Sequence, residues 1–204
     1  TTQKITPIVV GERFENLSLE AHAVYVWDVA GQKALFNKNA DAQLPLASVT
    51  KLMTALVAYE LLNDSAEIRI DVVAIQEEGE SGFIDGEKFS LRNLLDYTLI
   101  TSSNDGAVAL ANAAGGSVIG TTSGQDLFVE AMNMRAEEIG LTNTIFKNPT
   151  GLDVSATENG GYGSARDTAL LMEYLITHYP EVLANTKDDY LRIPNTGGQT
   201  HEAG

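Results

Sequence analysis

The stretch SVTKLMTALVAYELL, residues 48–62, decides the fold predicted for this chain. Its Leu, Met and Ala residues favour a helix, and apolar residues fall on nearly every side of that helix. A helix that is apolar all round is typical of the buried centre of a domain. Lys51 lies near the start of the stretch, three residues after Ser48, and residues at that spacing share a helix face. The sequence therefore predicts a central helix that brings a serine and a lysine together.

The segments on both sides predict further helices and a few short strands. Residues 21–37 contain two β-favouring runs around the turn-prone Ala30-Gly31-Gln32, which predicts a hairpin. Short apolar runs at residues 72–75 and from Tyr190 onward predict strands. Further helices are predicted at residues 91–100, 106–114, 124–139 and 165–179, with Ser90, Asp105 and Ser164 as N-caps, a capping-box partner at Asp167, and Gly115-Gly116, Gly140 and Pro180 beyond the helix ends.

The composition excludes several classes of function. The 204 residues include 28 Asp and Glu against 13 Lys and Arg, which gives a formal net charge of -15. Such a chain attracts polyanions poorly, so nucleic acid is not an expected partner. The absence of Cys excludes disulfides, thiolate metal sites and a cysteine nucleophile. His22, His178 and His201 lie far apart in the sequence, and neither a metal site nor a cofactor is predicted.

The ends of the chain and its organisation give weaker signals. No stretch is long and apolar enough to cross a membrane. The start, Thr1-Thr2-Gln3-Lys4, lacks an initiator Met and the apolar run of a signal peptide, which favours a mature or trimmed N-terminus. There is no internal repeat and no linker rich in Pro, Gly or Ser, so we expect residues 1–204 to form one domain.

Ser48 and Lys51 suit nucleophilic catalysis. A serine hydroxyl is a weak nucleophile until a base takes its proton, and a lysine acts as that base only when burial or cationic neighbours lower its pKa. A buried helix supplies the burial, and its positive N-terminal end favours the developing alkoxide. The alternative is an exposed lysine beside a capping serine, because a Ser-x-x-Lys match is expected about once by chance in a chain of this length.

Ser102-Ser103-Asn104 is a second polar element, between two predicted helices. A loop there is able to present side chains to a cleft, although the same residues also fit a simple helix stop before the Asp105 cap. The pattern Ser-x-Asn gains weight from the Ser-x-x-Lys pattern about fifty residues earlier, because both occur together in penicillin-binding proteins and class A β-lactamases.

Four segments resemble one known family in their order along the chain. The chain is similar to the low-molecular-mass penicillin-binding proteins that act as serine-type D-alanyl-D-alanine carboxypeptidases. The segments are YVWDVAGQKALFNKNADAQLPLASVTKLMTA (25–55), LITSSNDGAVALA (99–111), MNMRAEEIGLTNTIFKNPTGLD (132–153) and YGSARDTALL (162–171).

The resemblance implies a role for each matching residue. Ser48 would be the acylated nucleophile and Lys51 the base in acylation. Ser102 would relay a proton to the leaving D-alanine, and Asn104 would bind the peptide amide of the substrate. The implied activity is the trimming of peptidoglycan stem peptides that end in D-Ala-D-Ala, in cell-wall biosynthesis, with β-lactams as covalent inhibitors.

The resemblance also implies a fold and a location. The expected fold class is α+β, of the β-lactamase and DD-peptidase type, with a helical lobe, an incomplete antiparallel sheet, and Ser48 at the cleft between them. The implied location is extracytoplasmic, in the bacterial periplasm or at the cell surface, and no signal peptide is visible in this chain.

One family motif has no match. The family binds the substrate carboxylate with Lys-Thr-Gly on an edge strand, whereas the nearest string here, Asn195-Thr196-Gly197, lacks the lysine. We expect the motif on sequence beyond Gly204, so that the domain is truncated at its C-terminus and this chain alone is inactive. An isolated two-stranded sheet is marginally stable, so a C-terminal segment or a complementary chain is expected to complete the sheet.

Three alternatives remain open at this point. A class A β-lactamase adds a glutamate that activates the deacylating water, and Glu158 lies in a broadly similar region, although the pattern there favours a solvated loop residue. A peptidoglycan DD-endopeptidase shares every motif named above. A vestigial peptidoglycan-binding module is the alternative without enzyme activity.

Overall fold

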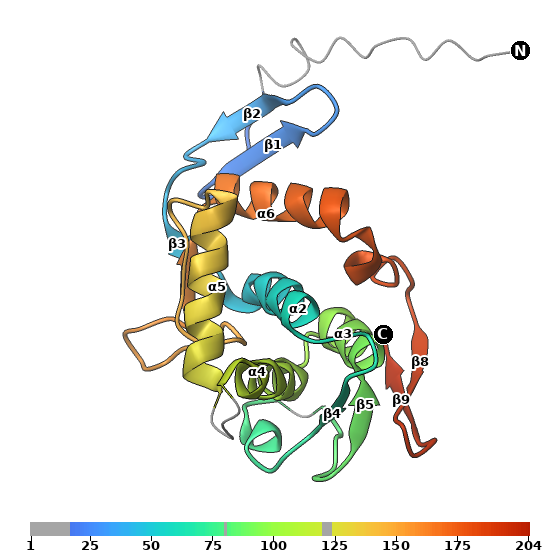
Figure 1. The fold of residues 1–204 in the computed structure, drawn as a ribbon. Helices are drawn as coiled ribbons and strands as arrows, with labels where there is room; N and C mark the ends of the chain where they lie inside the picture. The colour runs from blue at the N-terminus through green and yellow to red at the C-terminus, as the bar shows by residue number, and fades with distance from the viewer. Residues whose placement is uncertain (1–16, 80, 120–123) are drawn as a thin grey trace, which may run out of the picture.

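Helix α2, Thr50–Leu61, lies in the middle of the computed structural model, which describes residues 17–79, 81–119 and 124–204 (Figure 1). Residues 1–4, on which the N-terminal expectation rests, lie outside these ranges. In the described residues, four further α-helices surround α2, namely α3 (Leu91–Thr101), α4 (Asn104–Ile119), α5 (Gln125–Ile139) and α6 (Ala165–His178). Eight residues of α2 are buried, so the predicted central helix is confirmed.

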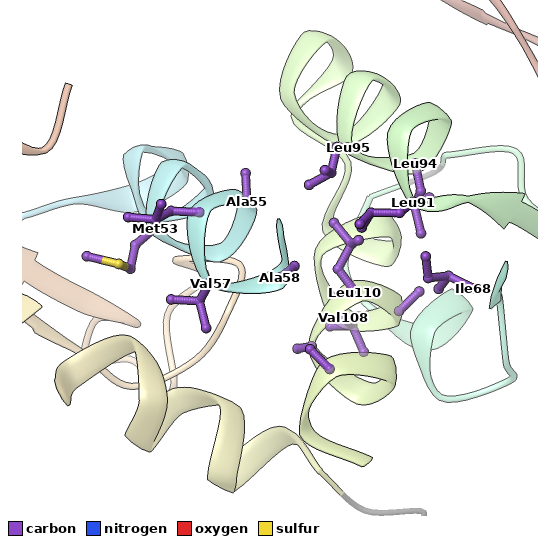
Figure 2. Packing of buried hydrophobic residues seen from close by; sticks show 14 of the residues in the cluster. Met53, Ala55, Val57, Ala58, Ile68, Leu91, Leu94, Leu95, Val108 and Leu110 are labelled. Atoms are coloured by element: carbon purple, nitrogen blue, oxygen red, sulfur yellow. The ribbon is translucent and has the colours of Figure 1, made fainter. Parts of the chain in front are cut away.

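The core lies where α2, α3 and α4 meet. Figure 2 shows apolar side chains of α3 and α4 on one side of α2, with Met53 and Val57 on another side of α2, and Met53, Leu94, Leu95 and Leu110 have no exposed surface. Burial of each such side chain stabilises the fold by roughly 1.5–3 kcal/mol. The start of α2 is therefore fixed by packing along the rest of the helix.

The strands of the described ranges form four small antiparallel sheets. Strands β1 (Val24–Asp28) and β2 (Lys33–Lys38) make the predicted hairpin, which lies beside α6 in Figure 1. The other sheets pair β3 (Leu44–Pro45) and β6 (Ile145–Phe146) with β7 (Gly161–Gly163), β4 (Glu67–Arg69) with β5 (Lys88–Ser90), and β8 (Leu191–Pro194) with β9 (Thr200–Ala203). Helices with small antiparallel sheets confirm the α+β class.

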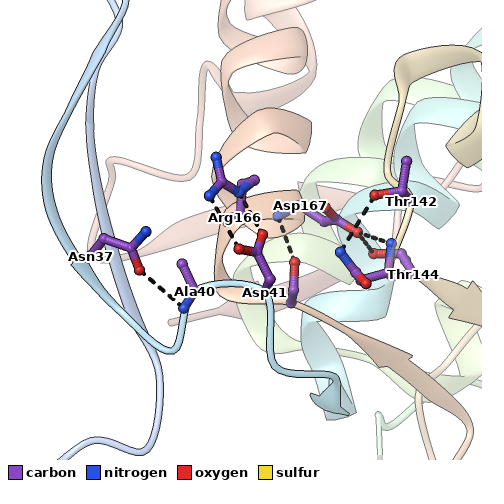
Figure 3. Close-up of polar contacts among 9 residues, drawn as sticks. Asn37, Ala40, Asp41, Thr142, Thr144, Arg166 and Asp167 are labelled. Atoms are coloured by element: carbon purple, nitrogen blue, oxygen red, sulfur yellow. Dashed lines mark hydrogen bonds and ion pairs between the residues drawn. The ribbon is translucent and has the colours of Figure 1, made fainter.

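The N-terminus of α6 joins three parts of the chain (Figure 3). Ser164 caps the helix by accepting from the backbone N–H of Asp167, as predicted. The Asp167 carboxylate does not complete the capping box, because its Oδ2 accepts from the backbone N–H of Asn143 and the hydroxyl of Thr144. Arg166 forms an ion pair with Asp41. The segment before α2 and the segment before β6 are thereby held on one helix end.

Two predictions about α4 are wrong. Ser103, not Asp105, caps the helix, because its hydroxyl accepts from the backbone N–H of Gly106 at 2.9 Å. The helix continues through Gly115-Gly116 to Ile119. A Cβ added at Gly115 would overlap the backbone of Gly124, so this glycine permits close approach of two segments and does not end the helix.

The predicted strand at residues 72–75 is also wrong. The carboxylate of Asp71 accepts from the backbone N–H of Ala74 and starts a 3-10 turn, η2, Ala74–Gln76. Val72 and Val73 are exposed by 51% and 53%. β-Branched residues favour strands only where they pack, and here a local Asp turn prevails. Across the described part of the chain, every helix is too short or too polar to span a membrane.

Candidate active site

Ser48 lies in a short 3-10 helix, η1 (Ala47–Val49), directly before α2. It is exposed, whereas the side chain three residues later points into the protein. Ala47 has a φ of 46°, an uncommon value for a residue with a Cβ. Such strained backbone concentrates at functional sites, where the surrounding structure fixes it. The serine hydroxyl is thus presented to solvent at the positive end of a buried helix.

Lys51 is 2% exposed, and its Nζ lies 3.0 Å from the Oγ of Ser48. The same Nζ donates to the backbone carbonyl of Thr150 at 3.0 Å. Burial lowers the pKa of Lys51 from 10.5 to about 8, because the charged ammonium loses hydration. The predicted contact between the serine and the lysine is present, with the lysine buried rather than exposed.

The loop at residues 148–152 packs against the segment that carries Ser48 and Lys51. The Oδ1 of Asn148 accepts from the backbone N–H groups of Thr150 and Gly151, which closes a tight turn. Thr54, one turn beyond Lys51, donates its hydroxyl to the carbonyl of Pro149 at 2.7 Å. Gly151 has a φ of 83°, and a Cβ there would overlap the carbonyl of Ala47. Only glycine lets this loop approach the nucleophile so closely.

The turn Ser102-Ser103-Asn104 connects α3 to α4, both of which pack on α2. Ser102 is exposed and has a left-handed conformation, with a φ of 59°. Buried Ser103 caps α4 and shares a 2.6 Å hydrogen bond with the hydroxyl of Ser81. Asn104 donates from its Nδ2 to the backbone carbonyl of Glu78. Glu78 and Ser81 therefore fix this turn.

The four candidate residues fall into two groups. Ser48 and Lys51 touch each other, and Ser102 and Asn104 share one turn. Within the described ranges, no hydrogen bond or ion pair joins the two groups. Sequence reasoning missed the partners that position both groups, namely Thr150, Ser103 and the carbonyl of Glu78. Of these, only Ser103 left a sequence signal, because its hydroxyl stands three residues before Gly106, the spacing of an N-cap.

The two weaker candidates from the sequence, Asn195-Thr196-Gly197 and Glu158, make structural contacts. Asn195-Thr196-Gly197 forms the turn between β8 and β9, where Asn195 bonds Glu87 and the N–H of Thr196 donates to the carbonyl of Lys88. Glu158 is an exposed partner of Lys147. In the part of the chain that the structure describes, no cluster of His, Asp or Glu is suited to hold a metal ion.

The sequence profile of the D-alanyl-D-alanine carboxypeptidases matches residues 11–202. The chain belongs to this family. It is 36% identical over 189 residues to the D-alanyl-D-alanine carboxypeptidase DacF of Bacillus subtilis, which covers 89% of this chain and 46% of that protein. The chain spans about half the length of the curated carboxypeptidases that it matches.

Two solved structures extend the family match to the fold. The D-alanyl-D-alanine carboxypeptidase DacD of Francisella tularensis superposes with a TM-score of 0.79 at 32% identity, over 92% of this chain and 44% of that one. Penicillin-binding protein D2 of Listeria monocytogenes, in its ampicillin-bound form, superposes with a TM-score of 0.69 at 29% identity, over 92% of this chain and 73% of that one. The fold described above is therefore the fold of the D-alanyl-D-alanine carboxypeptidases.

Proposed function

We propose that this chain carries the acyl-transfer machinery of a serine-type D-Ala-D-Ala carboxypeptidase, with Ser48 as the nucleophile and Lys51 as its base. The observation that carries the proposal is the 3.0 Å contact between the Oγ of Ser48 and the Nζ of a buried Lys51. A lysine with a pKa of about 8 is partly neutral near pH 7, which a general base requires.

The carbonyl of Thr150 supports this role by holding one N–H of the amine. With that N–H engaged, the lone pair of neutral Lys51 is free to face the hydroxyl of Ser48. The Oγ of Ser48 attacks the carbonyl carbon of the D-Ala-D-Ala peptide bond while its proton passes to Lys51. We assign the backbone N–H of Ser48, directly before α2, as one donor to the developing oxyanion, which the positive N-terminal end of α2 also stabilises.

Departure of D-alanine, which completes acylation, uses Ser102 and Asn104. Collapse of the tetrahedral intermediate breaks the C–N bond, and Ser102 relays a proton to the leaving amine of D-alanine. Asn104 binds the peptide amide of the acyl part. Water then hydrolyses the ester on Ser48 and regenerates the hydroxyl. Penicillins enter by the same attack, in which Ser48 opens the lactam ring and stays acylated.

Covalent labelling with a fluorescent penicillin tests the nucleophile. We expect an adduct on the peptide that contains Ser48, identified by mass spectrometry, and none in Ser48→Ala. Ser65→Ala is a matched control, because Ser65 is an exposed serine outside the site that should not affect labelling. Labelling that persists in Ser48→Ala, or turnover of penicillin as fast as by a β-lactamase, would show that the proposal is wrong.

The pH dependence of acylation tests the base. With a pKa of about 8, about half of Lys51 is neutral at pH 8 and about 1% at pH 6, so the rate of acylation should fall about 50-fold between these pH values. Above pH 8 the rate should level off. A rate that is flat between pH 6 and 8 would exclude Lys51 as the group that takes the proton.

We further propose that an additional segment, either C-terminal or from a complementary chain, completes the sheet begun by β1 and β2. Within the described ranges, β1 pairs only with β2, and two-stranded sheets are marginally stable alone. Amide hydrogen exchange tests the sheet, because the protein at its natural full length should protect edge amides of β1 or β2 that exchange fast in residues 1–204 alone. Equal exchange in both would contradict the proposal that another segment completes the sheet.

The proposed substrate, peptidoglycan, implies a location outside the cytoplasmic membrane.

A further inference from the structure

Asn133, on helix α5, bonds the outer edge of the small sheet that leads into the loop at residues 148–152. Strand β6 is the edge strand of the sheet β3-β7-β6. The Oδ1 of Asn133 accepts from the backbone N–H of Phe146, the last residue of β6, and its Nδ2 donates to the carbonyl of Phe146, both at 2.8 Å. One side-chain amide therefore bonds the two backbone groups that a neighbouring strand would bond.

The end of β6 lies four residues before the carbonyl to which Lys51 donates, that of Thr150. A second contact holds the chain between them, because the buried hydroxyl of Thr54 donates to the carbonyl of Pro149 at 2.7 Å. Helix α2 thus donates to two consecutive carbonyls, one from Thr54 and one from Lys51. A segment this short, held at both ends, gives the Thr150 carbonyl a defined position.

The position of this segment decides how much water reaches Lys51. Burial lowers the pKa of Lys51 to about 8, because the ammonium loses hydration. If the segment withdraws, water replaces the Thr150 carbonyl as an acceptor and also hydrates the rest of the ammonium. Loss of the carbonyl contact acts in the opposite direction, but the incoming water replaces that contact. The pKa of Lys51 should therefore rise toward its ordinary value of 10.5.

We propose that Asn133 and Thr54 are positioning residues that hold the Thr150 carbonyl against the amine of the base. The inference rests on the proposed function, because that function assigns the base to Lys51. In the described part of the chain, the hydrogen bonds of both side chains go to residues other than Ser48 and Lys51. Both residues therefore act through the segment that leads to Thr150, and α5 contributes to the site without touching the reacting groups.

The pH dependence of acylation by benzylpenicillin tests the inference on the protein at its natural full length. Asn133→Leu removes both hydrogen bonds and keeps a side chain of similar size. The pH at which acylation reaches half of its plateau rate should rise by about one unit above the wild-type value. The rate at pH 7 should then fall about tenfold, whereas the rate at pH 10 should approach that of the wild type. A merely structural role would instead slow acylation equally at every pH.

Asn93→Leu is the matched control, because Asn93 also lies on a helix and donates its Nδ2 to a strand carbonyl, that of Pro194 in β8. Its pH midpoint of acylation should stay at the wild-type value. Thr54→Val removes the hydroxyl with little change of shape and should raise the midpoint as Asn133→Leu does. Thr54→Ser keeps a hydroxyl and should restore the wild-type midpoint.

A midpoint that stays near 8 in Asn133→Leu and Thr54→Val, or acylation that slows equally at every pH, overturns the inference while the catalytic assignment stands. If Asn133→Leu does not fold, the midpoint of Thr54→Val decides. A wild-type rate that is flat between pH 6 and 8, or no benzylpenicillin adduct on Ser48, overturns the proposed function as well.

Discussion

The Ser48–Lys51 pair and the Ser102–Asn104 turn are held in different ways. The pair is set by one helical turn, and among the described residues its one distant hydrogen-bond partner is the backbone carbonyl of Thr150. The turn depends on a segment more than twenty residues earlier in the chain, through Ser81 and the carbonyl of Glu78. The first group is rigid because α2 is buried, whereas the geometry of the second depends on a loop. Changes to the pair should therefore abolish chemistry, and changes to the turn should weaken it.

Lys51→Met should have the largest effect. Without the amine no described group contacts the Ser48 hydroxyl, so acylation by penicillin should slow by about 10²–10⁴, the usual contribution of a general base. Stopped-flow or gel-based acylation rates measure this. The thermal midpoint should change little, because the apolar chain removes the cost of burying an amine while the carbonyl of Thr150 loses its hydrogen bond. A large loss of stability would mean that the slower acylation is a structural effect, and would contradict a purely catalytic role for Lys51 in the pair.

The pair was predictable from the sequence because its geometry is local. Spacing of three residues on an apolar helix predicts the contact, and the same apolar pattern predicts the burial that lowers the pKa of Lys51. The cap at Ser90 and the end of α5 at Gly140 are local in the same sense. The family segments add the role of each residue, which spacing does not supply.

The supports of the turn were not predictable, because they are tertiary. Nothing near Ser103 in the sequence indicates that its hydroxyl meets Ser81, and nothing near Glu78 indicates that its carbonyl holds Asn104. The same reason explains the wrong end predicted for α4. Gly115 reads as a helix stop, but its lack of a side chain serves contact with Gly124, which only the fold brings close.

Gly151→Ala should have the next largest effect, because it tests the one loop that supports the pair. The alanine Cβ would overlap the Ala47 carbonyl, and the φ of 83° is strained for any residue with a side chain. We expect a loss of roughly 1–3 kcal/mol of unfolding free energy, measured in urea, and slower acylation. Gly198→Ala is the control, since its φ of 87° is equally strained but lies in the β8–β9 turn with open space around it. Equal acylation defects in Gly151→Ala and Gly198→Ala would contradict a specific role of the loop at residues 148–152 in supporting the pair.

Ser103→Ala should have the smallest effect, and it tests the turn directly. The variant removes the N-cap of α4 and the bond to Ser81, which should cost about 1–2 kcal/mol of stability. Because Ser102 and Asn104 flank this residue, acylation should slow several-fold, while the pH at which the acylation rate levels off stays near 8, since Lys51 keeps its burial and its Thr150 contact. Ser81→Ala should reproduce the slower acylation with a smaller loss of stability, since α4 keeps its cap. If Ser103→Ala instead shifts that pH, the turn and the pair are electrostatically coupled, and the two regions form one unit.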